Sequence, residues 1–591
     1  MGARHCECYH SVMTRTVYLP ARFWLSFAVI FLLVGAGHVQ GARLEVVTEP
    51  RNEAVEDNIR AYIGSVGERD AASLRRFASH ARDQARSAMR ALGYYQGRVR
   101  YQVIEGEPPV LRLEVTTGEP VRLRDIEVEV RGKASQMEVF QLPARLELSE
   151  GDVLNHAHYE AIKRFYRNQA LRYGFFDGEF TTRRLEVNPE EGTADIRLVY
   201  ESGERYTLGE VSFPEGVYFD EKLLQRFVRF EPGTPYDSDH TIRLTRDLRG
   251  TNYFRDVLVD ADPRQAEDRE IPVSVDLTER TRHSLGAGLG FSTDVGPRVR
   301  TTWTQHYLNP QGHRRGAEME LSEPRQNLGA FYEIPLNPPM TDSLRFTTAY
   351  QTEDIEDTRS ERFSLGTQWT TELDSGWQQT VSLRREDDRF RVGDERDRTL
   401  LVLPGLSYSY IRRDSPVDPS RGYRLRTEVS GGQRDVFSDI DVLNSKAEAK
   451  GLITLGTAGH RFLARTQIGA VGTNDFQRVP PFLRFFAGGD QSVRGYGFRQ
   501  LSPVDENGDR VGGRFLLESS VEYQYPLSQR WRLATFVDQG NAFDELGDRL
   551  KTGVGVGIRW VSPVGPLRLD IARALDSPER FRLHFSMGPE L

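Results

Sequence analysis

Residues 552–560 read TGVGVGIRW, a strict alternation between large apolar side chains and glycine or arginine. Successive side chains of a β-strand point to opposite faces, so Val554, Val556 and Ile558 share one face. Gly555 and Arg559 fall on the other face. The stretch therefore predicts a strand with one apolar face and one small or polar face.

The same alternation recurs from about Thr281 onward. Further examples are TRHSLGAGLGFST at 281–293, LESSVEYQY at 517–525, WRLATFVD at 531–538 and FRLHFSM at 581–587. Alternation alone would also fit a soluble sandwich with one wet face. Aromatic residues at the strand ends and charges on the opposite face favour a membrane barrel with a wet lumen. Residues 281–591, at roughly 19 residues per strand and turn, predict a transmembrane antiparallel β-barrel of about 16 strands.

Residues 42–280 are organised differently, because a helix, a small residue, aromatics and a strand recur there in that order. The copies are RSAMRALGYYQGRVRYQV from Arg86, RNQALRYGFFDGEFTTRRLEV from Arg167 and TRDLRGTNYFRDVLVDAD from Thr245. Gly93, Gly174 and Asn252 hold equivalent places, at spacings of 81 and 78 residues. Glycine or asparagine there predicts a left-handed helix C-cap. The period predicts three small α+β modules, at 42–120, 121–203 and 204–280; one αβ domain with chance similarity is the alternative.

Two further segments are predicted to be hairpins. LRLEVTTGEPVRL from Leu111 and DIRLVYESGERYTL from Asp195 each contain an alternating strand, a turn with glycine and a second strand. Such a pattern is typical of paired strands joined by a short loop.

The N-terminus has the features of a secretory signal peptide at residues 1–41. An apolar run at residues 23–34 follows Arg15 and Arg22, and small residues precede a cleavage site before Ala42. An N-terminal membrane anchor is the alternative, although the run is shorter than the roughly 20 residues that a spanning helix needs. Cys6 and Cys8 are the only cysteines. The mature chain would then have no disulfide framework and no thiolate metal site.

Composition narrows the function. The formal net charge of −8 argues against a nucleic-acid partner, which calls for a basic face. The mean hydropathy of −0.53 is that of a soluble protein, but lipid-facing and lumen-facing residues average out in a barrel. No nucleophile–base pair and no metal-ligand spacing stands out, so we expect no catalytic residues, no metal and no cofactor.

Three motifs carry a family resemblance. They are AGGDQSVRGYGFRQLSP from Ala487, FVDQGNAFD from Phe536 and GVGVGIRWVSPVGPLRLDIARALD from Gly553. Together they resemble the outer-membrane assembly-factor (BamA) superfamily, and the modules resemble its periplasmic POTRA domains. The resemblance implies an inward-folded loop whose motif is Val493, Arg494, Gly495 and Tyr496. It also implies a lumen-facing strand that pairs with this loop through Phe536, Asp538 and Gly540.

The residues support this interpretation independently. Glycines 488, 489 and 495 allow the loop to bend and to approach other backbone closely. Asp538 falls on the lumen face by strand parity. A guanidinium and a carboxylate in a lumen form a charge-assisted, often bidentate pair, so we predict an ion pair between Arg494 and Asp538. The alternative is that Arg494 is an exposed loop residue.

The seam between the first and last strands is predicted to be the weakest in the barrel. Gly286, Gly288 and Gly290 lie in the first strand, where glycine weakens pairing and packing. The last strand carries Leu583 and Phe585. A weak lateral seam could open and expose unpaired backbone groups to a client strand. The compatible alternative is that these glycines make room for the inward loop.

The resemblance implies a non-enzymatic factor in the outer membrane of a Gram-negative bacterium. Such a factor inserts or translocates autotransporters and other β-barrel proteins in the lipid bilayer, with an inner-membrane-anchored partner similar to TamB. Exposed strand edges of the modules could also accept a client strand. A two-partner-type secretion channel and a passive porin remain alternatives, and a large steady conductance would favour either of them.

Overall fold

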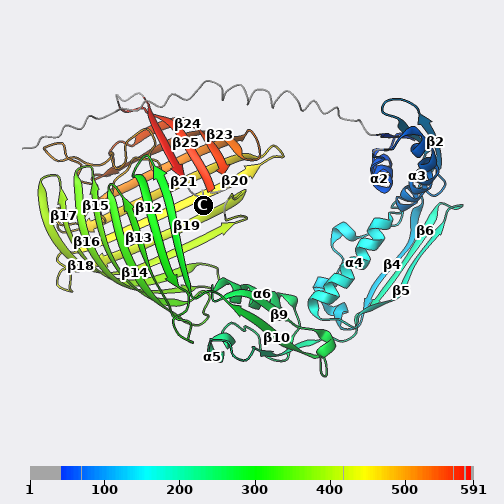
Figure 1. The fold of residues 1–591 in the computed structure, drawn as a ribbon, viewed down its shortest axis with the longest axis horizontal. Helices are drawn as coiled ribbons and strands as arrows, with labels where there is room; N and C mark the ends of the chain where they lie inside the picture. The colour runs from blue at the N-terminus through cyan, green and yellow to red at the C-terminus, as the bar shows by residue number, and fades with distance from the viewer. Residues whose placement is uncertain (1–41, 68, 417, 563–564, 578–580, 588–591) are drawn as a thin grey trace, which may run out of the picture. The chain divides into compact units, whose positions relative to one another are not determined.

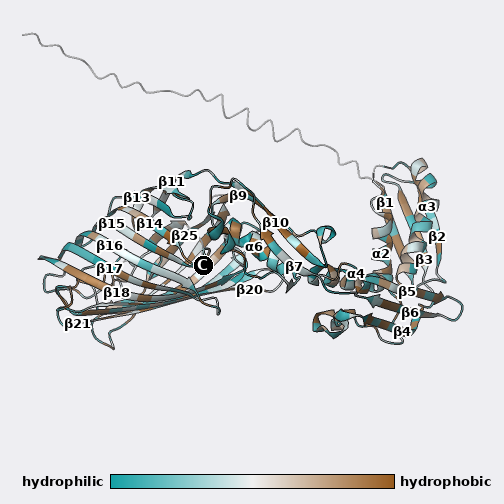
Figure 2. Cartoon of the chain, turned by 90° about the horizontal axis from the view of Figure 1, so that it is seen from below, coloured by the Kyte–Doolittle hydropathy of each residue, from teal (hydrophilic) through white to brown (hydrophobic). Residues whose placement is uncertain are grey.

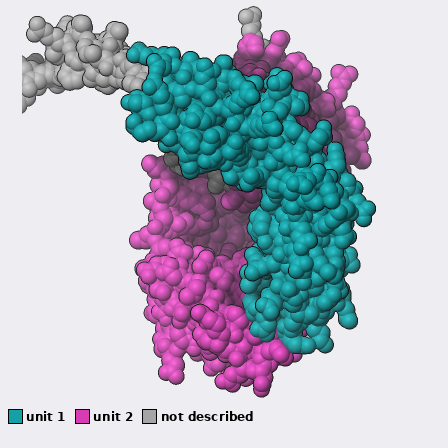
Figure 3. Space-filling model, turned by 90° about the vertical axis from the view of Figure 1, so that its right-hand side faces the viewer, with its two compact units in different colours: residues 1–205 teal, residues 206–591 magenta. Residues whose placement is uncertain are grey.

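The computed structural model describes residues 42–67, 69–416, 418–562, 565–577 and 581–587. The predicted signal peptide, with Cys6 and Cys8, lies outside the described residues. The chain divides into two compact units, residues 1–205 and 206–591, which Figure 3 colours separately. No helix in the described part of the chain is both long enough and apolar enough to cross a membrane.

The first module packs two helices on a three-stranded sheet. Its elements are β1 (Arg43–Glu49), α2 (Glu53–Ile63), α3 (Ala71–Ala91), β2 (Arg98–Ile104) and β3 (Val110–Thr116). The strand order is β1-β3-β2, with β1 parallel and β2 antiparallel to β3. Helix α3 buries small side chains such as Ala81 and Ala85, which lets it lie close to the sheet.

The second module repeats this sheet but replaces the first helix by short turns. Its elements are β4 (Arg122–Arg131), three 3-10 helices (Lys133–Gln136, Glu138–Phe140, Ala144–Leu146), α4 (His156–Tyr173), β5 (Glu179–Asn188) and β6 (Thr193–Glu201), with strand order β4-β6-β5. The Tyr95 hydroxyl lies 2.7 Å from Nε2 of His156 and links the modules. Burial lowers the pKa of His156, so its ring is neutral near pH 7. The hydrogen bond between Tyr95 and His156 therefore joins two uncharged groups.

The predicted helix ends are confirmed by backbone angles. Gly93, Gly174 and Asn252 have φ values of 88°, 81° and 62°, all in the left-handed region. The aromatics that follow Gly174 and Asn252, Phe175 and Tyr253, are buried. The sequence repeat therefore corresponds to a helix end that recurs in each module and is followed by an aromatic side chain that packs in the module core.

The predicted hairpins at Leu111 and Asp195 are wrong. Each segment consists of two strands, but β3 and β4 belong to different sheets, as do β6 and β7 (Thr207–Ser212). The glycine-containing turns at Gly118 and Gly203 link modules. Each module's last strand pairs instead with the strand before it and with its first strand, because helix packing closes the sheet within the module.

The second unit begins with a third module. After β7 it contains α5 (Glu221–Gln225), β8 (Thr234–Pro235), α6 (Ser238–Gly250), β9 (Phe254–Asp260), a 3-10 helix (Pro263–Gln265) and β10 (Glu270–Glu279), with strand order β8-β7-β10-β9. The Tyr253 hydroxyl donates to the Gly312 carbonyl at 2.6 Å, and the Asp220 amide donates to the Pro310 carbonyl at 3.0 Å. These bonds join the module to the turn between the second and third barrel strands.

A single sheet of 16 strands forms the barrel, which confirms the predicted fold class and strand number (Figure 1). The strands are β11 (His283–Ser292), β12 (Gly296–Gln305), β13 (Arg314–Ser322), β14 (Arg325–Pro335), β15 (Ser343–Ile355), β16 (Thr358–Glu372), β17 (Gln378–Val392), β18 (Glu395–Arg413), β19 (Arg421–Gly432), β20 (Val442–Leu455), β21 (His460–Thr473), β22 (Phe515–Pro526), β23 (Trp531–Phe543), β24 (Lys551–Ser562), β25 (Gly565–Ala574) and β26 (Arg582–Met587). Because β11 starts directly after the third module, we call that rim the module end and the opposite rim the far end.

The two faces of the barrel wall follow the sequence alternation. On β22, Val521 is 60% exposed on the outer face, whereas Glu522 is 7% exposed on the inner face. Figure 2 shows hydrophobic and hydrophilic residues alternating along the strands. At the module end of β23 and β24, Trp531 and Trp560 stack with ring centroids 5.3 Å apart. Paired aromatics at a strand end are typical of the interfacial girdle of a membrane barrel.

Candidate functional site

The 474–514 segment between β21 and β22 folds into the barrel and forms its own small core against the wall. We call it the inward loop. Its buried apolar residues are Val479, Leu483, Phe485, Ala487, Val493, Tyr496 and Leu501, and they pack against wall residues that include Leu403, Leu516, Ala542 and Ala574. Arg484 braces the loop internally by donating to the carbonyls of Gln477, Val479 and Val511 at 2.7–2.8 Å.

Arg494 joins the loop to the wall, and the predicted ion pair with Asp538 is present. Nε and Nη2 of Arg494 donate to the two carboxylate oxygens of Asp538 at 2.7 and 2.9 Å. The Arg494 amide also donates to Asp538, at 3.1 Å. Arg494 is 6% exposed and Asp538 is 0% exposed. Charge-assisted bonds of this kind are strong, and removing one partner would leave a buried charge without compensation.

Three further wall residues extend the pair into a network. Nη1 of Arg494 donates to Glu522 at 2.9 Å and to Asp570 at 3.1 Å. Arg559 donates to the same two carboxylates, at 2.6–2.9 Å. Two guanidinium groups thus bind three carboxylates from β22, β23 and β25. Strand alternation already predicted that Glu522 and Arg559 face the lumen. It could not predict that they lie at the same level along the barrel axis as Arg494.

Phe536, Gly540 and Gly495, which belong to the predicted strand and loop motifs, lie close to this network. The Phe536 ring lies under the Arg494 guanidinium, whose carbon is 3.3 Å from the ring centroid. Such a cation–π contact adds to the ion pair. Gly540 on the same strand lies where a Cβ would come within 2.7 Å of the Leu517 carbonyl. Gly495 has a φ of 97°, and a Cβ there would lie 2.8 Å from the Ala574 amide. A glycine is therefore required at this close approach.

The strand glycines that make room for the loop include Gly469 on β21, where a Cβ would overlap the Phe485 ring, and Gly553 on β24, but not those on β11. A Cβ at Gly553 would overlap the carbonyl oxygen of Arg494. By contrast, a Cβ at Gly286 or Gly290 would meet only Thr302 or Arg298 of β12, and one at Gly288 would meet nothing within 4 Å. The loop therefore does not explain the glycines of the first strand.

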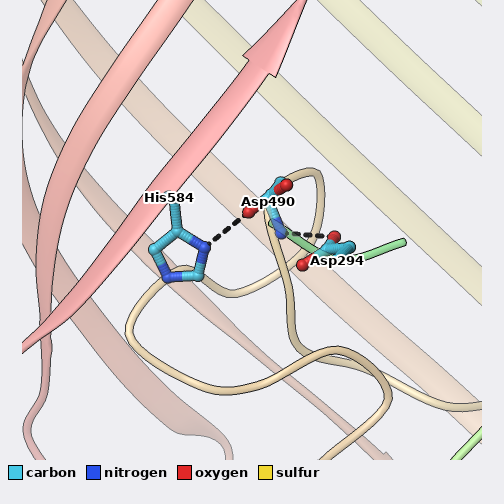
Figure 4. A group of neighbouring side chains, drawn as sticks. All are labelled: Asp294, Asp490 and His584. Carbon is cyan, nitrogen blue, oxygen red and sulfur yellow. Dashed lines mark hydrogen bonds and ion pairs between the residues drawn. The ribbon is translucent and has the colours of Figure 1, made fainter. Parts of the chain in front are cut away.

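A second set of contacts ties the loop to both sides of the seam (Figure 4). Oδ1 of Asp490 lies 2.7 Å from Nδ1 of His584 on β26. The Asp490 amide donates to Asp294, in the turn between β11 and β12, at 2.7 Å. The Gly495 amide donates to Nε2 of His584 at 2.9 Å, so Nδ1 carries the ring proton and donates it to Asp490. One loop residue thus bonds to the first hairpin and to the last strand.

Asp294, Asp490 and His584 are also the group in the described residues that could hold a metal ion, since their ligand atoms lie within 4.8 Å of one another. Both ring nitrogens of His584 already take part in hydrogen bonds, so the ring would have to give up one of them to bind an ion. Sequence reasoning missed this cluster. Parity placed His584 in the lumen, but no local signal connects it with a turn residue almost 300 positions away.

Among the described residues, the predicted seam has no strand ladder. Each strand from β11 to β26 pairs with its neighbours in the sheet, but β26 and β11 do not pair with each other. Within the described residues, the seam has one backbone bond, from the Thr293 amide to the Phe585 carbonyl at 3.2 Å. The Phe585 amide donates to the Thr293 hydroxyl at 3.1 Å, and the Phe585 ring lies 5.8 Å from that of Phe291. Leu583 is exposed on the outer face.

The comparisons with known proteins agree with this architecture. Residues 281–590 match the model of the Omp85 superfamily domain, and residues 45–117 match that of the first POTRA domain of TamA. The chain is 28% identical over 442 residues to the outer membrane protein assembly factor BamA of Nitratidesulfovibrio vulgaris, a match that covers 70% of this chain and 55% of that protein. It is 22% identical over 564 residues to the BamA of Neisseria meningitidis, covering 80% of this chain and 68% of that one.

A solved structure shares the fold. BamA from Haemophilus ducreyi lacking POTRA domains 1–3 superimposes with a TM-score of 0.64 at 16% identity, covering 79% of this chain and 99% of that one. This chain spans just over half the length of the BamA of N. vulgaris.

Replacing Arg494 by alanine should destabilise the barrel by roughly 3–5 kcal/mol, because Asp538 would stay buried without its partner. Urea titration of the folded protein in lipid vesicles measures this. Arg300→Ala is the matched control, since Arg300 also pairs with a carboxylate, Glu318, at 2.7 Å, but its side chain is 56% exposed. That variant should lose at most about 1 kcal/mol. Equal losses in the two variants would contradict an anchoring role for Arg494.

Gly553→Ala should displace the inward loop, because the new methyl group would overlap the Arg494 carbonyl. We expect faster protease cleavage within residues 474–514 and a stability loss of about 1–3 kcal/mol, as for other overpacked sites. Gly288→Ala, on a strand with open space around the new methyl group, is the control and should leave both quantities unchanged. Cleavage at the wild-type rate in Gly553→Ala would show that the loop does not depend on this contact.

Proposed function

We propose that this chain, which belongs to the Omp85 superfamily, is a non-enzymatic factor that inserts β-barrel proteins into the outer membrane. Membership places the barrel in the outer membrane and the POTRA modules in the periplasm, so the module end is periplasmic and the far end is extracellular. The finer part of the proposal is that its clients are autotransporters and other outer-membrane barrels.

The seam between β11 and β26 is the observation that carries the proposal. In hydrocarbon, backbone groups without hydrogen-bond partners are costly, so an incompletely paired seam is where a barrel would part first. An exposed strand edge offers donors and acceptors at the spacing that another strand needs. A client strand could therefore add to β11 or β26 and leave the barrel laterally.

The inward loop makes a permanently open channel the weaker candidate. Its apolar core and the Arg494 network occupy the lumen beside β22 to β25. A client crossing through the lumen would have to break these buried contacts. Among the described residues, a client inserting at the seam would have to break the few bonds around Thr293, Phe585 and Asp490.

We further propose that the chain is a TamA-type subunit of a translocation and assembly module and works with a TamB-like, inner-membrane-anchored partner. The match of residues 45–117 to the first POTRA domain of TamA supports this. The first module is the proposed docking site, because it is the module that matches a TamA domain.

A disulfide across the seam should stop insertion of client barrels. Thr293→Cys with Phe585→Cys joins two residues that share a backbone hydrogen bond, and neighbouring positions of this kind fall within disulfide reach. Liposomes containing the wild-type protein should insert an unfolded client barrel faster than protein-free liposomes. Liposomes containing the oxidised variant should not, and reduction should restore the rate.

Val521→Cys with Val537→Cys is the control, because these residues face each other across the ordinary ladder of β22 and β23. Oxidation of that pair should leave insertion unchanged. Single Thr293→Cys shows the effect of losing the threonine hydroxyl. Insertion at an unchanged rate by the locked seam variant, with the cross-link verified, would reject lateral insertion and favour the lumenal channel.

Capture from native membranes tests the partner. The full chain should co-purify with a long inner-membrane-anchored protein, and Tyr101→Glu on the edge strand β2 of the first module should capture severalfold less of it. Leu171→Glu, which places the same charge on an exposed apolar site of the second module, is the control. Equal capture by both variants would contradict docking on the edge strand of the first module.

A further inference from the structure

Three arginines lie side by side on the outer face of the barrel near its extracellular rim. The register places Arg359 of β16 directly opposite Arg391 of β17, and Arg391 directly opposite Arg396 of β18. All three side chains are exposed. Like charges directly opposite each other destabilise a sheet, so this row raises the free energy of the barrel unless something outside the wall compensates.

The outward direction of this row follows from the burial of its neighbours. Phe390 and Val392, which alternate with Arg391 on β17, are buried inside the barrel. Leu401 and Leu403, of opposite parity to Arg396 on β18, are fully buried. The arginines therefore share the face of the lipid-exposed side chains.

A second row, one pair closer to the membrane, adds two arginines. Here Arg389 lies opposite Glu361 on one side and opposite Arg398 on the other. Arg398 pairs with Asp387 at 2.7–2.8 Å, and Arg359 lies 3.5 Å from Glu361 and 4.0 Å from Asp354. Among the described residues, Arg389, Arg391 and Arg396 form no ion pair. We call the five residues Arg359, Arg389, Arg391, Arg396 and Arg398 the arginine face.

On β16 and β18 the arginine face begins where the apolar band ends. Phe363 on β16 and Leu400 on β18 are the last apolar side chains of the outer face toward the extracellular rim, and Arg398 follows Leu400 at the next outward position. Two residues of a strand span roughly 7 Å. The arginine face therefore lies at the height of the lipid headgroups in the outer leaflet.

A shallow hollow of about 600 Å³ lies over these residues, and all five arginines line it. A guanidinium is a planar fork of donors that matches the oxygen geometry of a phosphate, and it can bind one in bidentate fashion. The apolar side chains just beneath, such as Phe363, could contact acyl chains of the same molecule.

We propose that the arginine face is a binding site for a phosphorylated lipid of the outer leaflet, whose phosphate groups insert between Arg389, Arg391 and Arg396. The hollow is also lined by Glu361 and Asp397, but five arginines outnumber these two carboxylates, and phosphate supplies further negative charge. A soluble anion would satisfy the charge but not the apolar band beneath it. The occupant is therefore a lipid, bound through its headgroup and lying along the wall.

The test uses the folded full chain in detergent micelles and bisphosphorylated lipid A as the probe. The wild-type protein should bind lipid A, more weakly as salt is raised, and should unfold at a higher temperature in its presence. The triple variant Arg389→Gln, Arg391→Gln, Arg396→Gln should bind roughly tenfold or more weakly and lose the thermal shift. Without lipid it should be at least as stable as the wild type, because the repulsion within the row is gone.

The matched control removes three charges at the other rim. Arg412→Gln, Arg421→Gln, Arg530→Gln changes exposed arginines at the periplasmic end and should bind lipid A like the wild type. If the triple variant fails to fold, the single variant Arg391→Gln replaces it and should show a smaller loss in the same direction. Unchanged binding by the arginine-face variants, or an equal loss in the periplasmic control, would overturn the proposal. So would complete displacement of lipid A by millimolar inorganic phosphate, which would identify a free anion as the ligand.

Discussion

Backbone groups that face hydrocarbon must find hydrogen-bond partners, and the arrangement of the whole barrel depends on this constraint. The wall meets it by a ladder between every neighbouring pair of strands from β11 to β26. The wall departs from this constraint at the seam, where the described residues of the two sides share one backbone hydrogen bond. A seam of this kind needs support from outside the ladder. The inward loop supplies it, because Asp490 bonds to His584 on one side and to Asp294 on the other.

The loop itself stays in place because its own polar groups are satisfied. Arg494 would be expensive to bury alone, but the network gives it carboxylates on several strands and an aromatic ring beneath. Gly495 and Gly553 help to hold the loop in place because they have no side chains. A side chain at either position would push the loop backbone away from β24 and β25. Charge pairing and the absence of two side chains thus act together at one place in the wall.

Strand parity explains why much of this could be predicted and where prediction ended. Alternation assigns a face to each residue, so the barrel and the lumenal position of Asp538 followed from the sequence, and the length of the alternating segment gave the strand number. Alternation says nothing about height along the wall or about which strand lies opposite. For that reason the mixed carboxylate–guanidinium network and the Asp294–Asp490–His584 cluster escaped, although the lumenal face of His584 was correct. The same limit caused the error at Leu111 and Asp195, where two strands adjacent in sequence were taken to be partners in space.

The inward loop is attached more strongly to one side of the seam than to the other. The proposed opening should therefore move one particular side of the seam. Arg494 binds wall residues of β22, β23 and β25, and Gly495 bonds to His584 on β26, so the loop is held firmly by the C-terminal strands. Its bonds to the first hairpin run through Asp490 to Thr293 and Asp294, both in the turn between β11 and β12. Parting the seam therefore costs least if the first hairpin moves away while the loop stays with the last strands. The edge that is then presented to a client at full length is that of β11, a strand whose glycines do not contact the loop.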